Sequence, residues 1–431
     1  MAYIEKLGKL RSDREKKAKF VAKREKKPFM FKFGWAADAV EMPLHVHTYN
    51  LPGMHDLGTG YYFTPPPEVI EETKKALDEG YVRYLNNYSL NDAIAEKLRV
   101  ENRIEADPNT EIYVIGGIAP GMNLVPMALL NPGDECLTIN PDYTIQESAA
   151  ILGAHAKVVK VPLKKAPGVK RPDSAYVFDP KEMEMRVTPK TKMISFCNPN
   201  NPAGYVYSEK DLKAIADIAE RYNLFVLCNE CYERKVFRNA PYGAEFRDNL
   251  VFKSFQALPD MFDRTATIQG VTKAYDMSGF RVGWIVANAK LIQTVYRLCF
   301  MSASARAPSF SQFGAIAALT PPVRERHIRD TNELVEKEIE MTCNSLNELQ
   351  GIDCPPPMGG QFVFPDISEL GMTDAEMVSF LIEKARVTTR TGSEFGLNGA
   401  GHLRICVCNP LEYQKIGLKK VEEAVRRYFA R

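Results

Sequence analysis

Short apolar runs alternate with amphipathic helical stretches through the middle of this 431-residue chain. In the stretch SEKDLKAIADIAERYN at 208–223, for example, apolar residues recur every three or four positions. This alternation predicts an α/β domain with a mostly parallel sheet, whose active site lies at the carboxyl ends of its strands. The strand-like runs lie at 112–117, 135–139, 156–163, 192–197, 224–229, 265–270 and 283–288.

The pattern changes after about residue 315. A long charged helix is expected at 323–349 and a last helix at 411–431, with a few strands between them. We therefore predict a large domain over residues 71–315 and a smaller α+β domain over residues 316–431, to which residues 31–70 contribute from the N-terminal side.

Charge is concentrated in an N-terminal arm, residues 1–30. Its first 27 residues hold eleven Lys or Arg against four Asp or Glu, which indicates either a contact for a polyanion or a solvated leader. Over the whole chain 56 basic and 54 acidic residues nearly cancel, so we expect neither nucleic acid nor a membrane as a partner. The uncharged run at 113–133 contains Pro, Gly and Asn, which favours a strand, turn and helix over a membrane span.

Nine cysteines lie scattered through apolar segments, which predicts reduced, buried thiols in a cytoplasmic protein. Cys228 and Cys231 form a C-x-x-C pair, which could be a redox dithiol, half of a zinc site, or two packing residues. His45, His47 and His55 include an H-x-H pair that could ligate a metal. Because no carboxylate or cysteine cluster lies near them in the sequence, we expect no metal.

Lys273 lies in the run GVTKAYDMSGFRVGW, directly after the strand-like run 265–270. Gly, Ala and apolar neighbours at a strand end partly desolvate a lysine, which favours the neutral amine, a nucleophile toward aldehydes. Arg281 follows eight residues later, and Gly283 comes next but one. A fixed arginine at this spacing could pair with a phosphate.

The run T-K-A-Y-x-x-x-G-x-R-x-G-W resembles the cofactor-lysine signature of fold-type I pyridoxal phosphate (PLP) enzymes, the class I and II aminotransferases of the aspartate aminotransferase superfamily. Further motifs follow in that family's order, so the resemblance covers roughly residues 50–430. It implies the PLP-transferase fold of type I, with PLP as the cofactor. It also implies that Lys273 bonds to the cofactor's aldehyde and then acts as general base and acid.

The segment VIGGIAPGMNLVPM is similar to the family's phosphate-binding strand, turn and helix. The resemblance implies that backbone N–H groups meet the phosphate at a helix N-terminus. Ile118 and Gly270 stand where the family commonly has phosphate-binding hydroxyls, so backbone groups and other side chains are expected to replace them. The residues expected at the phosphate are Gly117, Ile118, Ala119, Thr272 and Arg281.

Other motifs imply contacts to the ring of the cofactor. SFCNPNNPAG resembles the family's N-P-x-N-P-T-G, so Asn201 would hydrogen-bond the phenolic oxygen, as would Tyr232 in VLCNECYERKVF. Tyr143 in NPDYTIQE matches the aromatic residue that stacks on the pyridine. Tyr84 resembles the tyrosine that reaches the phosphate of the neighbouring subunit, which implies a homodimer with shared active sites.

The substrate implied by the resemblance is an α-amino acid, with a 2-oxo acid as the possible second substrate. RTGSEFG and GHLRICVCN look like the family's P-G-x-x-F-G and its arginine strand, so Arg404 would clamp the substrate carboxylate through a bidentate fork. The aromatic residues at 61–63 could line a side-chain pocket or pack in the core. The expected substrate contacts are Arg404, Asn201 and Gly58.

Asn229 departs from the family's pattern. VLCNECYERKVF is similar to V-I-x-D-E-x-Y-x-x-x-V-[FY], whose aspartate pairs with the pyridine nitrogen and keeps it protonated. A neutral carboxamide cannot form that ion pair and should weaken the ring as an electron sink. We therefore expect an aminotransferase and keep three alternatives: another PLP reaction (elimination, replacement, cyclisation, decarboxylation or racemisation), an engineered asparagine, or a PLP-binding homologue without turnover.

Overall fold

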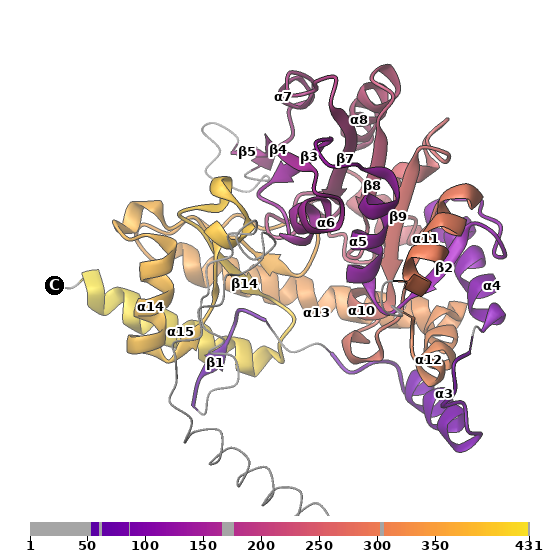
Figure 1. Ribbon diagram of the computed structural model, residues 1–431. Coiled ribbons are helices and arrows are strands. Elements are labelled where there is room, and N and C mark those ends of the chain that lie inside the picture. The colour runs from indigo at the N-terminus through magenta and orange to yellow at the C-terminus, as the bar shows by residue number, and fades with distance from the viewer. Residues whose placement is uncertain (1–52, 60–62, 86, 166–175, 302–305, 430–431) are drawn as a thin grey trace, which may run out of the picture. The chain divides into compact units, whose positions relative to one another are not determined.

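A central sheet of seven strands organises the fold (Figure 1). The computed structural model describes residues 53–59, 63–85, 87–165, 176–301 and 306–429. In spatial order the strands are β2 Ile112–Ile115, β10 Gly283–Val286, β9 Thr265–Gly270, β8 Phe225–Asn229, β7 Thr191–Cys197, β3 Glu135–Asn140 and β4 Lys157–Pro162. β10 is antiparallel to β2 and to β9, and the other neighbours are parallel. The predicted strand-like runs and the mostly parallel sheet are confirmed.

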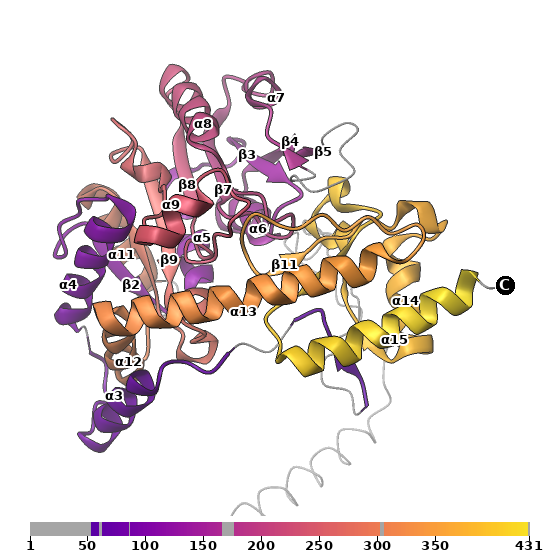
Figure 2. The same ribbon diagram turned by 180° about the vertical axis from the view of Figure 1, so that it is seen from behind.

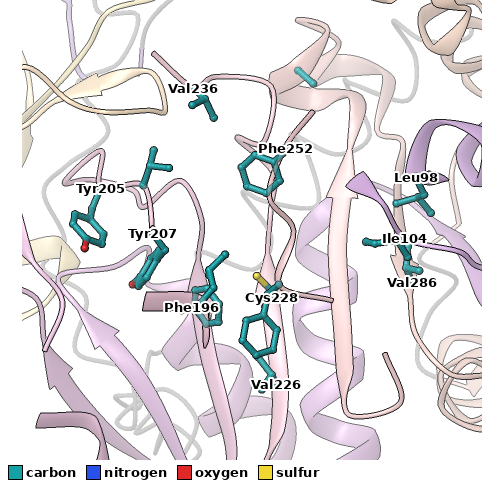
Figure 3. Close-up of a cluster of buried hydrophobic side chains, with 14 of the residues drawn as sticks. Leu98, Ile104, Phe196, Tyr205, Tyr207, Val226, Cys228, Val236, Phe252 and Val286 are labelled. Carbon is teal, nitrogen blue, oxygen red and sulfur yellow. The ribbon is translucent and has the colours of Figure 1, made fainter. Parts of the chain in front are cut away.

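Helices cover both faces of this sheet (Figures 1 and 2). One face packs against α5 Ile118–Leu129, α6 Ile145–Ala154 and α11 Ala289–Met301 around an apolar core of its own. A larger core on the other face includes side chains from α3 Pro67–Asp78, α4 Tyr88–Lys97, α8 Glu209–Arg221 and α12 Ser309–Leu319. Figure 3 shows part of this larger core, including Phe196, Val226 and Cys228.

Helix α8 shows how the local sequence sets an element. Ser208 and Asp211 form a capping box, in which each side chain accepts a hydrogen bond from the other residue's backbone N–H. Leu212, Ile215 and Ala219 then recur at helical spacing and are buried against the sheet. The helix predicted within 208–223 is therefore confirmed.

A second group of elements surrounds another apolar core. One of its sheets has three antiparallel strands, in the order β11 Phe362–Val363, β14 Leu403–Cys406 and β13 Arg390–Thr391. In the other sheet, β1 His55–Asp56 pairs in parallel with β12 Val387–Thr388. Its helices are α14 Asp374–Ala385 and α15 Leu411–Phe429. The pairing of β1 with β12 joins residues 55–56 to this C-terminal group, and the assignment of residues 31–70 to the smaller domain stays a prediction.

One long helix, α13 Pro321–Asn347, belongs to both groups of elements (Figure 2). Ile328 in its first half is buried in the larger core of the central sheet, whereas Val335, Ile339 and Cys343 are buried in the C-terminal core. The described residues, from 53 to 429, belong to one compact unit, and the predicted boundary at 315/316 stays a prediction. Other short elements include β5 Lys164–Lys165, β6 Tyr176–Val177, α7 Pro180–Glu184, α9 Gly243–Asn249, α10 Val271–Ala274 and a π-helical turn at Leu98–Asn102.

Several sequence-based predictions fall on residues outside the described ranges. These are the basic arm at 1–30, most of 31–70, the imidazoles of His45 and His47, and the aromatic residues Tyr61 and Tyr62. In the described part of the chain, no helix has both the length and the apolar character that a membrane crossing requires.

Candidate active site

A cavity of about 440 Å³ lies where the parallel strands of the central sheet end. Its wall includes Asn229 at the end of β8 and the segments that follow β2, β3, β7 and β9. Binding sites in open α/β sheets form at this edge, because the loops after neighbouring strands converge there. The predicted site residues that line the cavity are Ile118, Ala119, Tyr143, Asn201, Asn229, Tyr232, Thr272, Lys273, Arg281 and Arg404.

Lys273 reaches the cavity from α10, a single helical turn that begins directly after β9. All residues of β9 are buried, so the lysine stands on a fixed support. A side chain at Gly270 would bring its Cβ to 2.8 Å from the Val282 carbonyl oxygen. The close approach of β9 and β10 therefore explains why this position lacks a hydroxyl-bearing residue.

The N-terminus of α5 forms one end of the cavity. Gly117 is the N-cap residue, with φ +91°, and no side chain caps the helix. The N–H groups of the first turn, at Ile118 and Ala119, therefore remain for an anion at the positive end of the helix. A Cβ at Gly117 would lie 2.3 Å from Arg281 Nη2, so only glycine leaves room for that guanidinium.

Arg281 and Thr272 complete this anion site. Arg281 donates from Nη2 to the Gly116 carbonyl oxygen at 3.3 Å and from Nη1 to the Ser278 carbonyl oxygen at 3.0 Å, which fixes the guanidinium beside the helix N-terminus. The Thr272 hydroxyl is buried and has no hydrogen-bond partner among the described residues. A buried hydroxyl without a partner is costly, and an anion bound at this point would remove the cost. These residues fit a phosphate group.

Tyr143 and Asn229 occupy the middle of the cavity wall. The N–H of Tyr143 donates to Asp142 Oδ1 at 2.7 Å, and the N–H of Cys197 donates to Asp142 Oδ2 at 3.1 Å. Asp142 thereby joins the loop after β3 to the end of β7, and burial raises the pKa of its carboxyl group well above the usual value. Asn229 is 2% exposed and accepts a hydrogen bond at Oδ1 from the Cys231 N–H at 3.2 Å.

Arg404 on β14 forms the other end of the cavity. It donates from Nη1 to Asn201 Oδ1 and from Nη2 to the Gly58 carbonyl oxygen, each at 3.1 Å. Its guanidinium lies 4.1 Å from the ring centre of Phe362 and 4.7 Å from that of Phe395. Its Nε is buried without a hydrogen-bond partner in the described part of the chain. This fixed cation fits a carboxylate, and the three predicted substrate contacts, Arg404, Asn201 and Gly58, lie together.

The sequence-based prediction missed an ion pair in the cavity wall. Arg390 on β13 lies directly opposite Arg404 in the antiparallel pairing and donates from Nη1 to Glu394 Oε2 at 3.2 Å. Both members of the pair line the cavity. The likeness of RTGSEFG to the family's P-G-x-x-F-G assigns no role to its first residue, Arg390, which the register of β13 against β14 brings to the site.

A buried carboxylate lies behind the site. Glu230 accepts hydrogen bonds from the Ser254 hydroxyl at 2.8 Å, from the Gln269 side-chain amide at 3.0 Å and from the Phe255 N–H at 3.2 Å. Burial, and to a smaller extent the charge of the neighbouring Glu233, raise the pKa of Glu230 to about 7. Glu230 therefore faces the interior of the sheet and not the cavity.

Two other sequence features involve cysteine and histidine side chains that the structure describes in part. Cys228 is buried in the larger core of the central sheet, whereas Cys231 belongs to the C-terminal core and lines the cavity. The two cysteines of the C-x-x-C pair thus lie in different cores, which supports a packing role for each of them. His55 stacks on Tyr413, and no group of three or more His, Cys, Asp or Glu side chains suited to a metal occurs among the described residues.

Tyr84 does not line the cavity of its own chain and is 89% exposed. The predicted contact to a neighbouring subunit is therefore a prediction still to be tested. The remaining predicted site residues all lie at or beside the cavity.

Comparison with known proteins adds the family. The family model for aminotransferase class I and II matches residues 52–416. The chain belongs to the class I and II aminotransferases. It is a PLP-dependent aminotransferase of fold type I, as the run around Lys273 predicts.

Two curated relatives and one solved structure show how far the likeness extends. An aspartate aminotransferase of Pyrococcus abyssi is 31% identical over 84% of this chain and 89% of the relative. An aromatic-amino-acid aminotransferase of Thermococcus litoralis is 30% identical over 88% of this chain and 93% of the relative. The crystal structure of an aromatic aminotransferase from Pyrococcus horikoshii has a TM-score of 0.80 and 29% identity, covering 88% of this chain and 97% of that one.

Proposed function

We propose that the cavity holds PLP on Lys273 and exchanges amino groups between an α-amino acid and a 2-oxo acid. The observation that carries this proposal is a lysine after a buried strand, in a cavity whose wall includes two groups of residues suited to anions, one around Arg281 and one around Arg404. Of the side chains known to line it, Lys273, Arg281, Arg390 and Arg404 are basic and Glu394 is acidic, so the cavity suits a ligand with several negative groups.

Each end of the cavity would hold one negative group. The N–H groups of Ile118 and Ala119, with Arg281 and the Thr272 hydroxyl, would bind the phosphate of PLP. Arg404 would bind the α-carboxylate that both substrates share, while Asn201 holds the guanidinium in place. Two anions bound at fixed points orient the reacting carbon toward Lys273.

PLP supplies an aldehyde that forms a covalent bond with an amine and a ring that accepts electrons from the substrate. The protein's own contribution is proton transfer and positioning. The Lys273 amine would remove the proton from the substrate Cα and return it to the carbon of the former aldehyde. Tyr143 would cover one face of the ring, and Tyr232 and Asn201 would hydrogen-bond the phenolic oxygen at its edge.

The relatives bear the names aspartate and aromatic-amino-acid aminotransferase, so both kinds of amino acid belong in the first substrate panel. Nothing in the comparisons favours elimination, decarboxylation or racemisation over transamination. The test is to incubate the purified holoenzyme with single amino acids, with and without a 2-oxo acid acceptor, and to identify products by mass spectrometry. Amino-group transfer to the acceptor supports the proposal. Spectral changes without any 2-oxo acid, amine or elimination product would indicate a PLP-binding protein without turnover and would overturn it.

We also propose a homodimer in which Tyr84 serves the partner's site. Val82, Tyr84, Tyr88, Phe300 and Met301 are largely exposed apolar or aromatic side chains. Tyr88 on α4 and Tyr296 on α11 also line one surface pocket of about 510 Å³. A second copy of this chain would cover these residues and bring a tyrosine to the phosphate end of the cavity.

Mixing two inactive variants tests the shared site. Lys273→Ala removes the nucleophile, and Tyr84→Ala removes the contact offered to the partner. In a mixed dimer one site would contain both changes and the other neither, so co-refolding should restore activity. No recovery, despite mixed dimers seen by native mass spectrometry, would show that Tyr84 serves its own chain or no site. The reduced, buried thiols agree with a cytoplasmic location, which we propose together with the dimer.

A further inference from the structure

The orientation of the Asn229 carboxamide is fixed by a backbone group. Its Oδ1 accepts the N–H of Cys231 at 3.2 Å, and rotating the amide by half a turn would place two N–H donors against each other. The side chain lines the cavity although the residue as a whole is 2% exposed. Because Oδ1 accepts the Cys231 N–H, the group that Asn229 can offer to a ligand is its amide NH2 group, Nδ2, which is a hydrogen-bond donor.

The charged groups around Asn229 do not replace the missing carboxylate. In the loop after β3, both oxygens of Asp142 accept backbone N–H groups, and Asp142 is not among the described residues that line the cavity. Glu230, next in the chain, is held by Ser254 and Gln269 on the interior side. Within the described part of the chain, the charged side chains that share the cavity with Asn229 are Lys273, Arg281, Arg404 and the Arg390–Glu394 ion pair.

Among the described residues, Glu394 supplies the one carboxylate of that cavity wall, and this carboxylate is in an ion pair. Glu394 accepts a hydrogen bond from Arg390, on the strand that pairs with the Arg404 strand. It therefore belongs to the carboxylate-binding end, together with Phe395 and Arg404. The wall at the end of β8 consists of neutral side chains, namely Asn229, Cys197 and Cys231.

We infer that Asn229 donates a hydrogen bond from Nδ2 to the pyridine nitrogen of PLP and so keeps that nitrogen unprotonated. This inference rests on the proposed binding of PLP in the cavity. A protonated pyridine carries an N–H donor, which cannot bond to a second donor, whereas a neutral pyridine nitrogen is an acceptor. Hydrogen bonding to one form of a titrating group favours that form. This aminotransferase then works with a ring that is a weaker electron sink than the pyridinium of relatives with aspartate at this position.

The variant Asn229→Asp is a close isosteric test. One carboxylate oxygen can still accept the Cys231 N–H, so the anchor remains, and the second oxygen replaces the donor by a negative acceptor. The matched control is Asn223→Asp, the same chemical change at an exposed residue whose φ of +51° suits either side chain. Asn229→Ala removes both the anchor and the donor.

The measurement is nitrogen-15 NMR of PLP labelled at the ring nitrogen and loaded onto the apoenzyme at neutral pH. We expect the wild type and Asn223→Asp to give a signal in the range of unprotonated pyridine, and Asn229→Asp to give one in the pyridinium range. A pyridinium signal from the wild type, or an unprotonated signal from Asn229→Asp, overturns the inference. Should Asn229→Asp fail to fold, the wild-type signal decides, because the two forms resonate in separate ranges. Failure of the labelled cofactor to bind overturns the proposed function and is thus a distinct result.

Discussion

Arg404→Lys tests the carboxylate-binding end of the site, because lysine keeps the positive charge and loses the planar fork. Arg404 uses Nη1 and Nη2 to hold Asn201 and Gly58, and its guanidinium packs against two phenylalanine rings. An ammonium group cannot keep these contacts and also bind a carboxylate through two parallel hydrogen bonds. The substitution should therefore weaken substrate binding without unfolding the protein.

The size of the effect follows from the hydrogen bonds lost. A hydrogen bond to a charged group contributes about 1.5–3 kcal/mol, and lysine forfeits one of the two bonds of the fork. Since about 1.4 kcal/mol corresponds to a factor of ten, KM should rise roughly 10- to 150-fold. The α-carboxylate is common to both substrates, so KM for the amino acid and for the 2-oxo acid should rise by similar factors.

Each half-reaction can be followed separately by the absorbance of the cofactor under single-turnover conditions. Arg99→Lys is the matched control, because Arg99 is exposed and pairs only with Glu96 on the helix surface, an interaction of little energetic consequence. A KM that stays unchanged in folded Arg404→Lys for both substrates would refute the assignment. A rise for one substrate alone would place Arg404 at the side-chain end of the pocket.

Three further predictions concern the phosphate site and the interior. Gly117→Ala should lower apoenzyme stability by about 1–3 kcal/mol because of the positive φ, and it should lower PLP affinity because the new Cβ displaces Arg281. Denaturant unfolding measures the stability and PLP titration the affinity, and unchanged values would contradict the proposed phosphate site. Thr272→Val should raise apoenzyme stability by about 1 kcal/mol, since it removes a buried hydroxyl that has no hydrogen-bond partner among the described residues. The same substitution should lower PLP affinity about 10-fold or more. An unaltered affinity would show that Thr272 does not bind the phosphate. For Glu230 the pKa is raised from 4.5 to about 7 in the fold, so its stabilising contribution is fully present below pH 4.5 and is lost as pH rises through about 7. Glu230→Gln should flatten this part of the pH dependence of unfolding free energy, and an unchanged slope would show that another group titrates there.

The sequence predicted the central sheet well because each buried strand is a continuous apolar run bounded by turns. β3, β9 and β10 are buried along their whole length, and their boundaries fall within one or two residues of the apolar runs. The roles predicted for Lys273, Asn201 and Arg404 rest on runs of residues with a family-wide spacing, and they stay predictions. All three side chains line one cavity, to which Arg404 comes from β14 of a separate sheet.

The register between short strands and the orientation of individual side chains could not be predicted from the sequence. Arg390 meets Arg404 only because β13 and β14 pair at that register, and two-residue strands carry too weak a pattern to fix it. The carboxamide of Asn229 is oriented by the Cys231 N–H, a contact that depends on the backbone turn after β8. The position of Tyr84 relative to a second subunit likewise depends on surfaces that no local pattern encodes.

The central claim is that Lys273 carries PLP, and borohydride reduction of the holoenzyme tests it most directly. Reduction makes the bond between lysine and cofactor permanent, so proteolysis and mass spectrometry can locate the added pyridoxyl group. We predict that the group is found on Lys273 in the wild type and is absent from the Lys273→Ala variant. Modification of a different lysine, or no modification of a protein saturated with PLP, would contradict the account.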